Sequence, residues 1–173
     1  MKLIDSTLRE GEQTVGVAFP LAVKIEIVKL LALVGVEEIE LGIAARRNGC
    51  LPALMKHARK IPDRPQLSLW SRCRPEDVDI AASLPPEVLS LSIPASDRHL
   101  DAKFNGDRRW ALACLRNSLR QARRLGLSRV AVGLEDATRA EDNFLLELAA
   151  TAAAEGAFRV RLADTVGIAS PAR

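Results

Sequence analysis

Polar side chains that could do chemistry crowd the start of the chain, directly after a short apolar stretch at residues 2–4. Residues 5–13 include Asp5, Ser6, Thr7, Arg9, Glu10, Glu12 and Gln13. The guanidinium of Arg9 suits a carboxylate or a keto oxygen, Glu10 is a hard oxygen ligand, and Gln13 can orient a substrate. Burying such side chains costs free energy unless each finds a partner. The stretch therefore predicts a site at the carboxyl end of a first strand.

A second interpretation of this stretch is purely structural. It would be a polar turn between a strand and a helix, with Asp5 or Ser6 accepting a hydrogen bond as a cap. Gly11 and Gly16 fit both interpretations, because glycine allows unusual torsions and close approach. Residue types alone leave both interpretations open.

The composition is that of a globular domain with a core: 173 residues, 48% hydrophobic and 27% charged. With 3% aromatic residues and no tyrosine, base-stacking recognition of nucleic acid is disfavoured. The net charge of +3 comes mostly from arginines, and the densest cluster falls on a predicted helix, where a solvated outer face is the favoured interpretation. That cluster is Arg108, Arg109, Arg116, Arg120, Arg123 and Arg124.

Targeting and redox signals point to the cytoplasm. The sequence has no run of about eighteen apolar residues and no signal-peptide pattern, so we expect a cytoplasmic protein with no membrane partner. Cys50, Cys73 and Cys114 are odd in number and lack CxxC spacing. They are predicted to be thiols in a reducing compartment.

Short apolar segments alternate with helical patterns along the whole chain. Strands are predicted at residues 2–4, 36–43, 66–72, 87–93, 128–134 and 157–163. Helices are predicted at residues 19–34, 51–60, from 75 to the Pro85-Pro86 break, 107–125 and 140–155, with a polar loop from 94 to 106. In the first helix, Ile27, Leu30, Leu31 and Val34 share one face, whereas Lys24, Glu26 and Lys29 are polar.

This alternation predicts an α/β fold with a parallel sheet of about six βα units. Polar residues follow most of the strands, as in (β/α) barrels of the TIM type. An open doubly wound sheet is the competing architecture, although no Gly-x-Gly-x-x-Gly follows a strand. A complete barrel needs roughly 200 residues or more. We therefore expect residues 1–173 to be the N-terminal part of a catalytic (β/α)8 barrel, with about six of eight units.

Residues 3–13, LIDSTLREGEQ, resemble the opening signature of the metal-dependent aldolase-like TIM barrels, Asp-x-Thr-Leu-Arg-(Asp/Glu)-Gly-x-Gln. This group contains homocitrate, isopropylmalate and citramalate synthases and hydroxymethylglutaryl-CoA lyases. Similar motifs follow in the same order: Ser96-Asp97-x-His99 with Lys103, then residues 135–139 and 163–167. The resemblance, which extends over the whole chain, implies a metal-assisted Claisen condensation of acetyl-CoA with a 2-oxo acid.

The resemblance also implies roles for individual residues. Glu10 would be one ligand of a divalent cation (Mg, Mn or Zn), and Arg9 would stabilise the alkoxide formed from the keto oxygen. Glu135 would join Arg9 in catalysis, while Gln13 and Thr165 would bind substrate. His99 is expected near the pocket as a further substrate-binding residue, with a structural hydrogen bond as the alternative.

The metal site is expected to be incomplete. The resemblance calls for a His-x-His pair from a seventh strand, whereas this sequence has only His57 and His99, far apart. His57 lies among basic residues of a predicted helix and is expected at the surface. Hard cations want about six ligands, so residues 1–173 alone are expected to bind metal weakly and to be inactive. A complementing C-terminal segment or a homo-oligomer would supply the rest.

The fifth strand bears on which 2-oxo acid is used. Lysine-pathway homocitrate synthases carry an Arg and a Ser there, at positions that correspond to Ala131 and Gly133. The chain is more similar to the homocitrate synthase of nitrogen fixation, which favours 2-oxoglutarate, with isopropylmalate or citramalate synthesis as alternatives. A carbon–carbon lyase of the same superfamily, or a non-catalytic split or degenerate barrel subunit that completes a partner, also remains open.

Overall fold

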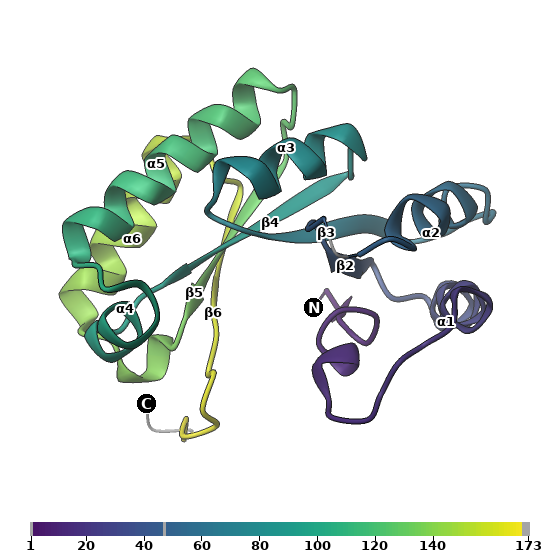
Figure 1. Cartoon of the computed structure of the whole chain (residues 1–173), viewed down its shortest axis with the longest axis horizontal. Coiled ribbons are helices and arrows are strands. Elements are labelled where there is room, and N and C mark those ends of the chain that lie inside the picture. Colours follow the sequence, from purple (N-terminus) through teal and green to yellow (C-terminus); the bar gives the residue numbers. More distant parts are fainter. Residues whose placement is uncertain (1, 47, 171–173) are drawn as a thin grey trace.

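Six parallel strands pair side by side in chain order in the computed structural model, which describes residues 2–46 and 48–170. They are β1 (Ile4–Asp5), β2 (Glu38–Ile43), β3 (Gln66–Arg72), β4 (Val88–Pro94), β5 (Val130–Glu135) and β6 (Arg159–Leu162). The sheet curls into a half-barrel, with the helices on its outer side (Figure 1). The predicted incomplete barrel is confirmed, and the open doubly wound sheet is not observed.

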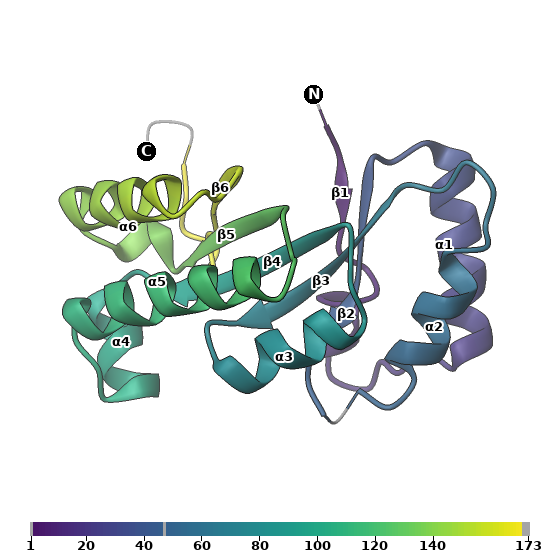
Figure 2. The ribbon, with the colours of Figure 1, turned by 90° about the horizontal axis from the view of Figure 1, so that it is seen from above.

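Within the residues that the structure describes, six α-helices connect or follow the strands. They are α1 (Leu21–Val34), α2 (Leu51–Ala58), α3 (Pro75–Ser83), α4 (Asp97–Phe104), α5 (Arg108–Arg124) and α6 (Asp142–Ala154). Helices α1 and α2 lie at one end of the sheet, and α4, α5 and α6 lie at the other (Figure 2). No helix in the described part of the chain is both long and apolar enough to cross a membrane.

Alternation along the strands separates an apolar outer face from a polar inner face. The parallel register sets Ile39 beside Leu67 and Leu91 beside Val132, so that the apolar side chains form rows. These rows are buried against the helices, in a core that includes Phe144 of α6. Because successive side chains point to opposite faces, the residues between them face the inside of the half-barrel. That inner set is mostly polar or small: Glu38, Glu40, Ser68, Trp70, Ser90, Ser92, Ala131, Gly133, Arg159 and Arg161.

Helix α4 was not predicted, because residues 94–106 were expected to be a polar loop. Its sequence is rich in charged residues and has no long apolar stripe. Ser96 nevertheless caps it, since the Ser96 hydroxyl accepts a hydrogen bond from the backbone N–H of His99 at 3.1 Å. The side chain of Lys103, which belongs to the motif in this segment, lies outside those that the structure describes.

The apolar face expected for the first helix was wrong in part. Leu30 and Val34 are 54% and 75% exposed, whereas Val28 and Lys24 are buried. Helix α1 carries apolar residues on every side, so periodicity could not identify its buried face. Lys24 is buried because its ammonium pairs with Glu12 at 2.6 Å.

Candidate active site

The loop after β1 is held in place by local hydrogen bonds and by one buried side chain. Asp5 makes a local turn, accepting hydrogen bonds from the backbone N–H of Thr7 at 3.0 Å and from the Thr7 hydroxyl at 3.1 Å. Leu8 is fully buried and anchors the loop to the core. Glu12 ties the loop to α1 through Lys24 and through the backbone N–H of Phe19 at 3.0 Å. These contacts fix the loop that carries Arg9, Glu10 and Gln13.

Arg9 is held from several sides. Its Nε donates to Glu40 at 3.0 Å and its Nη2 lies 2.9 Å from the same carboxylate. Its guanidinium also pairs with Glu10 and stacks on the Trp70 ring, 5.5 Å from the centroid. Only 15% of the Arg9 side chain is exposed, so the group is oriented before any ligand arrives.

Ion pairs from β2 to β6 cross the inside of the half-barrel. Arg159 forms a two-bonded fork with Glu38, at 2.9 and 3.0 Å. Two residues further along both strands, Arg161 donates a hydrogen bond from Nη2 to Glu40 at 2.8 Å. These contacts join residues 121 positions apart in the sequence and fix the curvature that brings β6 opposite β2.

Glu135 ends β5, and its carboxylate lies next to Ser92 and His99. The Ser92 hydroxyl donates to Glu135 Oε1 at 2.6 Å, and His99 Nδ1 lies 3.7 Å from Oε2. His99 is buried, with its ring against Phe104. The carboxylate thus faces the open side of the sheet with His99 behind it.

Asp136 links the loops that follow β4, β5 and β6. Its buried carboxylate accepts hydrogen bonds from the Ser96 hydroxyl and from Arg139, the latter at 2.7 Å. The Arg139 hydrogen bond is the main reason that the pKa of Asp136 lies below its usual range. The backbone N–H of Asp136 donates to the Thr165 hydroxyl at 2.8 Å, which positions Thr165. Asp136 itself takes a left-handed conformation, with φ of 58°.

A cavity of about 470 Å³, hereafter the central pocket, opens at the carboxyl edge of the sheet. Its lining includes five of the six predicted site residues: Arg9, Glu10, Gln13, Glu135 and Thr165. His99, the sixth, is not among the lining residues and lies behind Glu135. The polar residues that follow β1, β5 and β6 are therefore gathered around one cavity.

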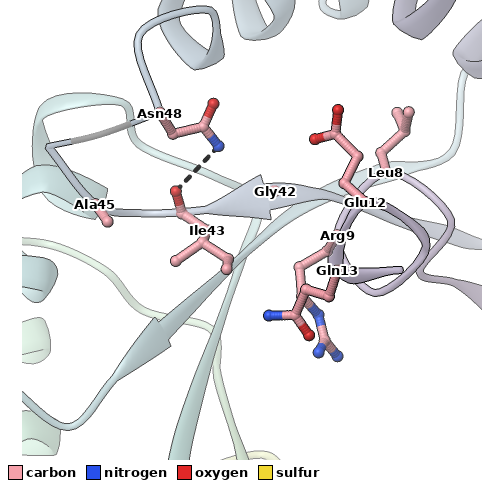
Figure 3. Close-up of a pocket in the computed structure, with 8 residues that line it drawn as sticks. All are labelled: Leu8, Arg9, Glu12, Gln13, Gly42, Ile43, Ala45 and Asn48. Atoms are coloured by element: carbon pink, nitrogen blue, oxygen red, sulfur yellow. Dashed lines mark hydrogen bonds between the residues drawn. The ribbon is translucent and has the colours of Figure 1, made fainter. Parts of the chain in front are cut away.

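A second cavity of about 330 Å³ adjoins the central pocket and shares Arg9 and Gln13 with it. In Figure 3 the side chains of Arg9 and Gln13 point to the same side, and Glu12 points away from them. Asn48 closes the far wall by donating to the Ile43 carbonyl at 3.3 Å. Arg9 and Gln13 thus face both cavities.

Comparison with known proteins gives the family. Residues 1–173 match the family described as HMGL-like. The chain belongs to the HMGL-like family. It is 40% identical to the homocitrate synthase of Frankia alni over 171 residues, which are 99% of this chain and 48% of that protein. It is 35% identical to 2-isopropylmalate synthase 2 of Caldanaerobacter subterraneus, covering 98% of this chain and 44% of that protein.

The HMGL-like chain thus spans about half the length of these curated relatives. Among solved structures, the hydroxymethylglutaryl-CoA lyase of Pseudomonas aeruginosa superposes with a TM-score of 0.82 at 18% identity. The match covers 98% of this chain and 59% of that one. This likeness supports the barrel fold.

The described residues of this HMGL-like chain do not form a metal site on their own. No group of three or more His, Cys, Asp or Glu side chains among them is placed to hold a metal ion. Glu10 lines the central pocket with 58% of its side chain exposed, next to Arg9. His57, expected at the surface, is exposed on α2. Glu10 alone offers one carboxylate, too few for a hard cation.

The lining of the central pocket also includes strand residues that were not among the predicted site residues, notably Trp70, Ser92 and Arg161. Each lies within a strand rather than after one. The alternation Arg159-Val160-Arg161-Leu162 was the available signal, because two arginines on the inner face of a barrel strand need acidic partners. Glu38 and Glu40 on β2 are those partners.

Replacing Glu40 with glutamine is expected to destabilise the protein by about 3 kcal/mol at neutral pH, because two guanidinium groups lose their shared anion. Burial raises the pKa of Glu40, but Arg161 and then Arg9 outweigh it and hold that pKa below its ordinary value. The stabilisation is therefore full above about pH 4.3 and is lost as the pH falls through the lowered pKa. The measurement is thermal unfolding of the wild type and of Glu40→Gln at several pH values between 7 and 3.

The control is Glu26→Gln, which breaks an exposed pair with Lys29 at 3.2 Å. Its effect should stay within about 0.5 kcal/mol at any pH. If the difference in unfolding free energy between the wild type and Glu40→Gln stays constant down to pH 3, the ionised Glu40 carboxylate is not what stabilises the fold.

Proposed function

We propose that the protein is an acyltransferase that condenses acetyl-CoA with a 2-oxo acid, with 2-oxoglutarate giving homocitrate as the substrate pair. The observation that carries the proposal is the convergence of Arg9, Gln13, Glu135 and Thr165, from three strand ends, on the central pocket. The relatives named homocitrate synthase and 2-isopropylmalate synthase support this reaction class. Nitrogen fixation is the process that the sequence resemblance favours.

In this reaction the deprotonated methyl carbon of acetyl-CoA attacks the keto carbon, and the keto oxygen becomes an alkoxide that is then protonated. Water hydrolyses the thioester and releases the CoA thiol. Arg9 stabilises the negative charge that develops on the keto oxygen, because its guanidinium is already oriented by Glu40 and Trp70. Glu135 orients the acetyl group from the fixed position given by Ser92, and Gln13 and Thr165 bind substrate carboxylates.

Glu10 would supply one oxygen ligand of a divalent cation, and further ligands would have to come from a complementing segment or chain. Such a cation polarises the keto group when bound. His99 acts through Glu135, as a residue that positions it.

The half-barrel needs further βα units. Within the described residues, β1 and β6 each pair with one neighbour only, and Leu162 of β6 is 68% exposed. Because unpaired parallel edges are unfavourable, we propose that a C-terminal segment or a second chain pairs with them. We place the protein in the cytoplasm, where Cys50, Cys73 and Cys114 stay as free thiols.

The test is thiol release from acetyl-CoA, followed with a thiol reagent in the presence and absence of a 2-oxo acid. We expect release only with the 2-oxo acid. Release from acetyl-CoA alone would indicate a hydrolase, and cleavage of a hydroxy-acyl-CoA without a 2-oxo acid would indicate a lyase. Absence of turnover with any 2-oxo acid in the complete protein would overturn the proposal and favour a non-catalytic subunit.

A further inference from the structure

The two arginines of β6 occupy equivalent positions but different surroundings. Both face the inside of the half-barrel and both pair with a glutamate of β2. Arg161 lines the central pocket, whereas Arg159 lines a separate cavity at the amino end of the strands, with Glu38. Arg159 therefore serves as a structural reference for Arg161, which faces the central pocket.

Their ion pairs differ in form. Arg159 and Glu38 make a one-to-one fork, in which two guanidinium nitrogens meet two carboxylate oxygens. Glu40, in contrast, divides its two oxygens between two arginines: Oε2 takes Arg9 and Oε1 takes Arg161. Arg9 also pairs with Glu10, so within the described part of the chain Arg161 is the guanidinium of the two that has a single carboxylate oxygen as its partner.

Arg161 also keeps hydrogen-bonding capacity for a ligand. Only its Nη2 donates to a protein acceptor, so Nε and Nη1 have no hydrogen-bond partner among the described residues. A guanidinium carries five N–H donors, of which several therefore remain available. With 26% of its side chain exposed, the group is accessible from the pocket.

The strand beside Arg161 leaves room for a ligand. Gly133 of β5 pairs in register with Arg161, and a Cβ added to Gly133 would lie 4.0 Å from Arg161 Nη2 and 3.6 Å from the Ser92 hydroxyl. Ala131, the next inward residue of β5, is also small. No side chain of β5 therefore covers the guanidinium at this position.

The position of Arg161 relative to Arg9 suggests the ligand. Both guanidinium groups bond to one carboxylate, so their bonded nitrogens lie at most about 8 Å apart. A small molecule with an anionic or keto group at one end and a carboxylate at the other can contact both. An aliphatic tail beside Arg161 would leave its free donors desolvated without partners, which is costly.

We propose that Arg161 binds the distal carboxylate of a dicarboxylic 2-oxo acid and so selects such acids over those with an aliphatic tail. This inference rests on the proposed function, in which Arg9 holds the 2-oxo end. Arg161 thereby determines substrate specificity from β6.

The test compares Arg161→Met, Arg161→Lys and the matched control Arg159→Met in the complete protein. The substrates are 2-oxoglutarate, which is dicarboxylic, and 2-oxoisovalerate, which is not. We expect Arg161→Met to lower kcat/KM for 2-oxoglutarate roughly 100-fold, mainly through KM, because a charge-assisted hydrogen bond is lost. The kcat/KM of Arg161→Met for 2-oxoisovalerate should stay the same or rise. Arg161→Lys should retain part of the kcat/KM for 2-oxoglutarate that Arg161→Met loses. Arg159→Met should affect both substrates in the same proportion.

Equal losses with both substrates in Arg161→Met would indicate a merely structural ion pair and overturn the inference. Calorimetric titration with each 2-oxo acid alone separates this failure from failure of the proposed function, since it needs no turnover. We expect the wild type to bind 2-oxoglutarate more tightly than 2-oxoisovalerate, and Arg161→Met to lose that preference. Equal affinities in the wild type would overturn the inference whether or not the protein condenses anything.

Discussion

Replacing Arg9 with glutamine is expected to lower kcat for condensation roughly 1,000-fold, because the donor nearest the developing alkoxide is removed. Glutamine keeps polarity and some hydrogen bonding but carries no charge. The fold should survive, since Glu40 keeps its bond to Arg161 and Leu8 keeps the loop anchored. Steady-state thiol release measures the loss of catalysis, and thermal unfolding of the same samples shows whether stability has changed as well.

The matched control for this change is Arg129→Gln. Arg129 is exposed and stacks on Phe158 at the amino end of the sheet, far from the predicted chemistry. Its activity should stay within about twofold of wild type, as is usual for surface substitutions. Arg9→Lys should recover part of the lost rate, because it restores the charge without the planar fork. Near wild-type turnover in Arg9→Gln would rule out the assigned role.

Replacing Glu135 with glutamine is expected to lower kcat roughly 100-fold, because displacement of a reacting group by about 1 Å has an effect of this size. The amide has the shape of the carboxylate but neither its charge nor two accepting oxygens. Ser92 would still have one oxygen as an acceptor, so the backbone around β5 should be little disturbed. The measurements are kcat and the KM for acetyl-CoA.

Ser92→Ala serves as the partner variant, since it removes the hydroxyl that orients Glu135 but keeps the carboxylate. The loss in kcat should be smaller, about 10-fold, at the low end of the range for one hydrogen bond to a charged group. An effect of Ser92→Ala as large as that of Glu135→Gln would show that the position of the strand, and not the carboxylate, governs the rate.

Much of the fold could be predicted because each strand is a short segment with regularly spaced apolar residues between clear breaks. Strand β3 was predicted at residues 66–72 and is observed as Gln66–Arg72, because prolines and polar residues bound it closely. Helix α4 was missed because its charged sequence has no long apolar stripe, and its capping serine was the only strong local signal. The exposed side of α1 could not be predicted from periodicity, because apolar residues lie on every side of this helix, Leu30 and Val34 on the exposed side among them.

The candidate site was predictable where its residues follow strands, since the carboxyl ends of parallel strands meet at one edge. Gln13 and Thr165 are 152 positions apart and line the same cavity for this reason. Arg161 was missed because it lies within a strand and its pairing with Glu40 depends on how far the sheet curls. Strand patterns predict the order of the units, whereas the contacts across the inside of the half-barrel depend on the curvature of the sheet.

The most direct test of the central claim is to follow the methyl carbon of acetyl-CoA labelled with ¹³C at that position. The complete protein is incubated with this substrate, a divalent cation and 2-oxoglutarate, and the products are examined by NMR. The account predicts the label in a new CH₂ group bonded to a tertiary alcohol carbon, and loss of this signal in Arg9→Gln. Label recovered only as free acetate, or as unchanged acetyl-CoA, would contradict it.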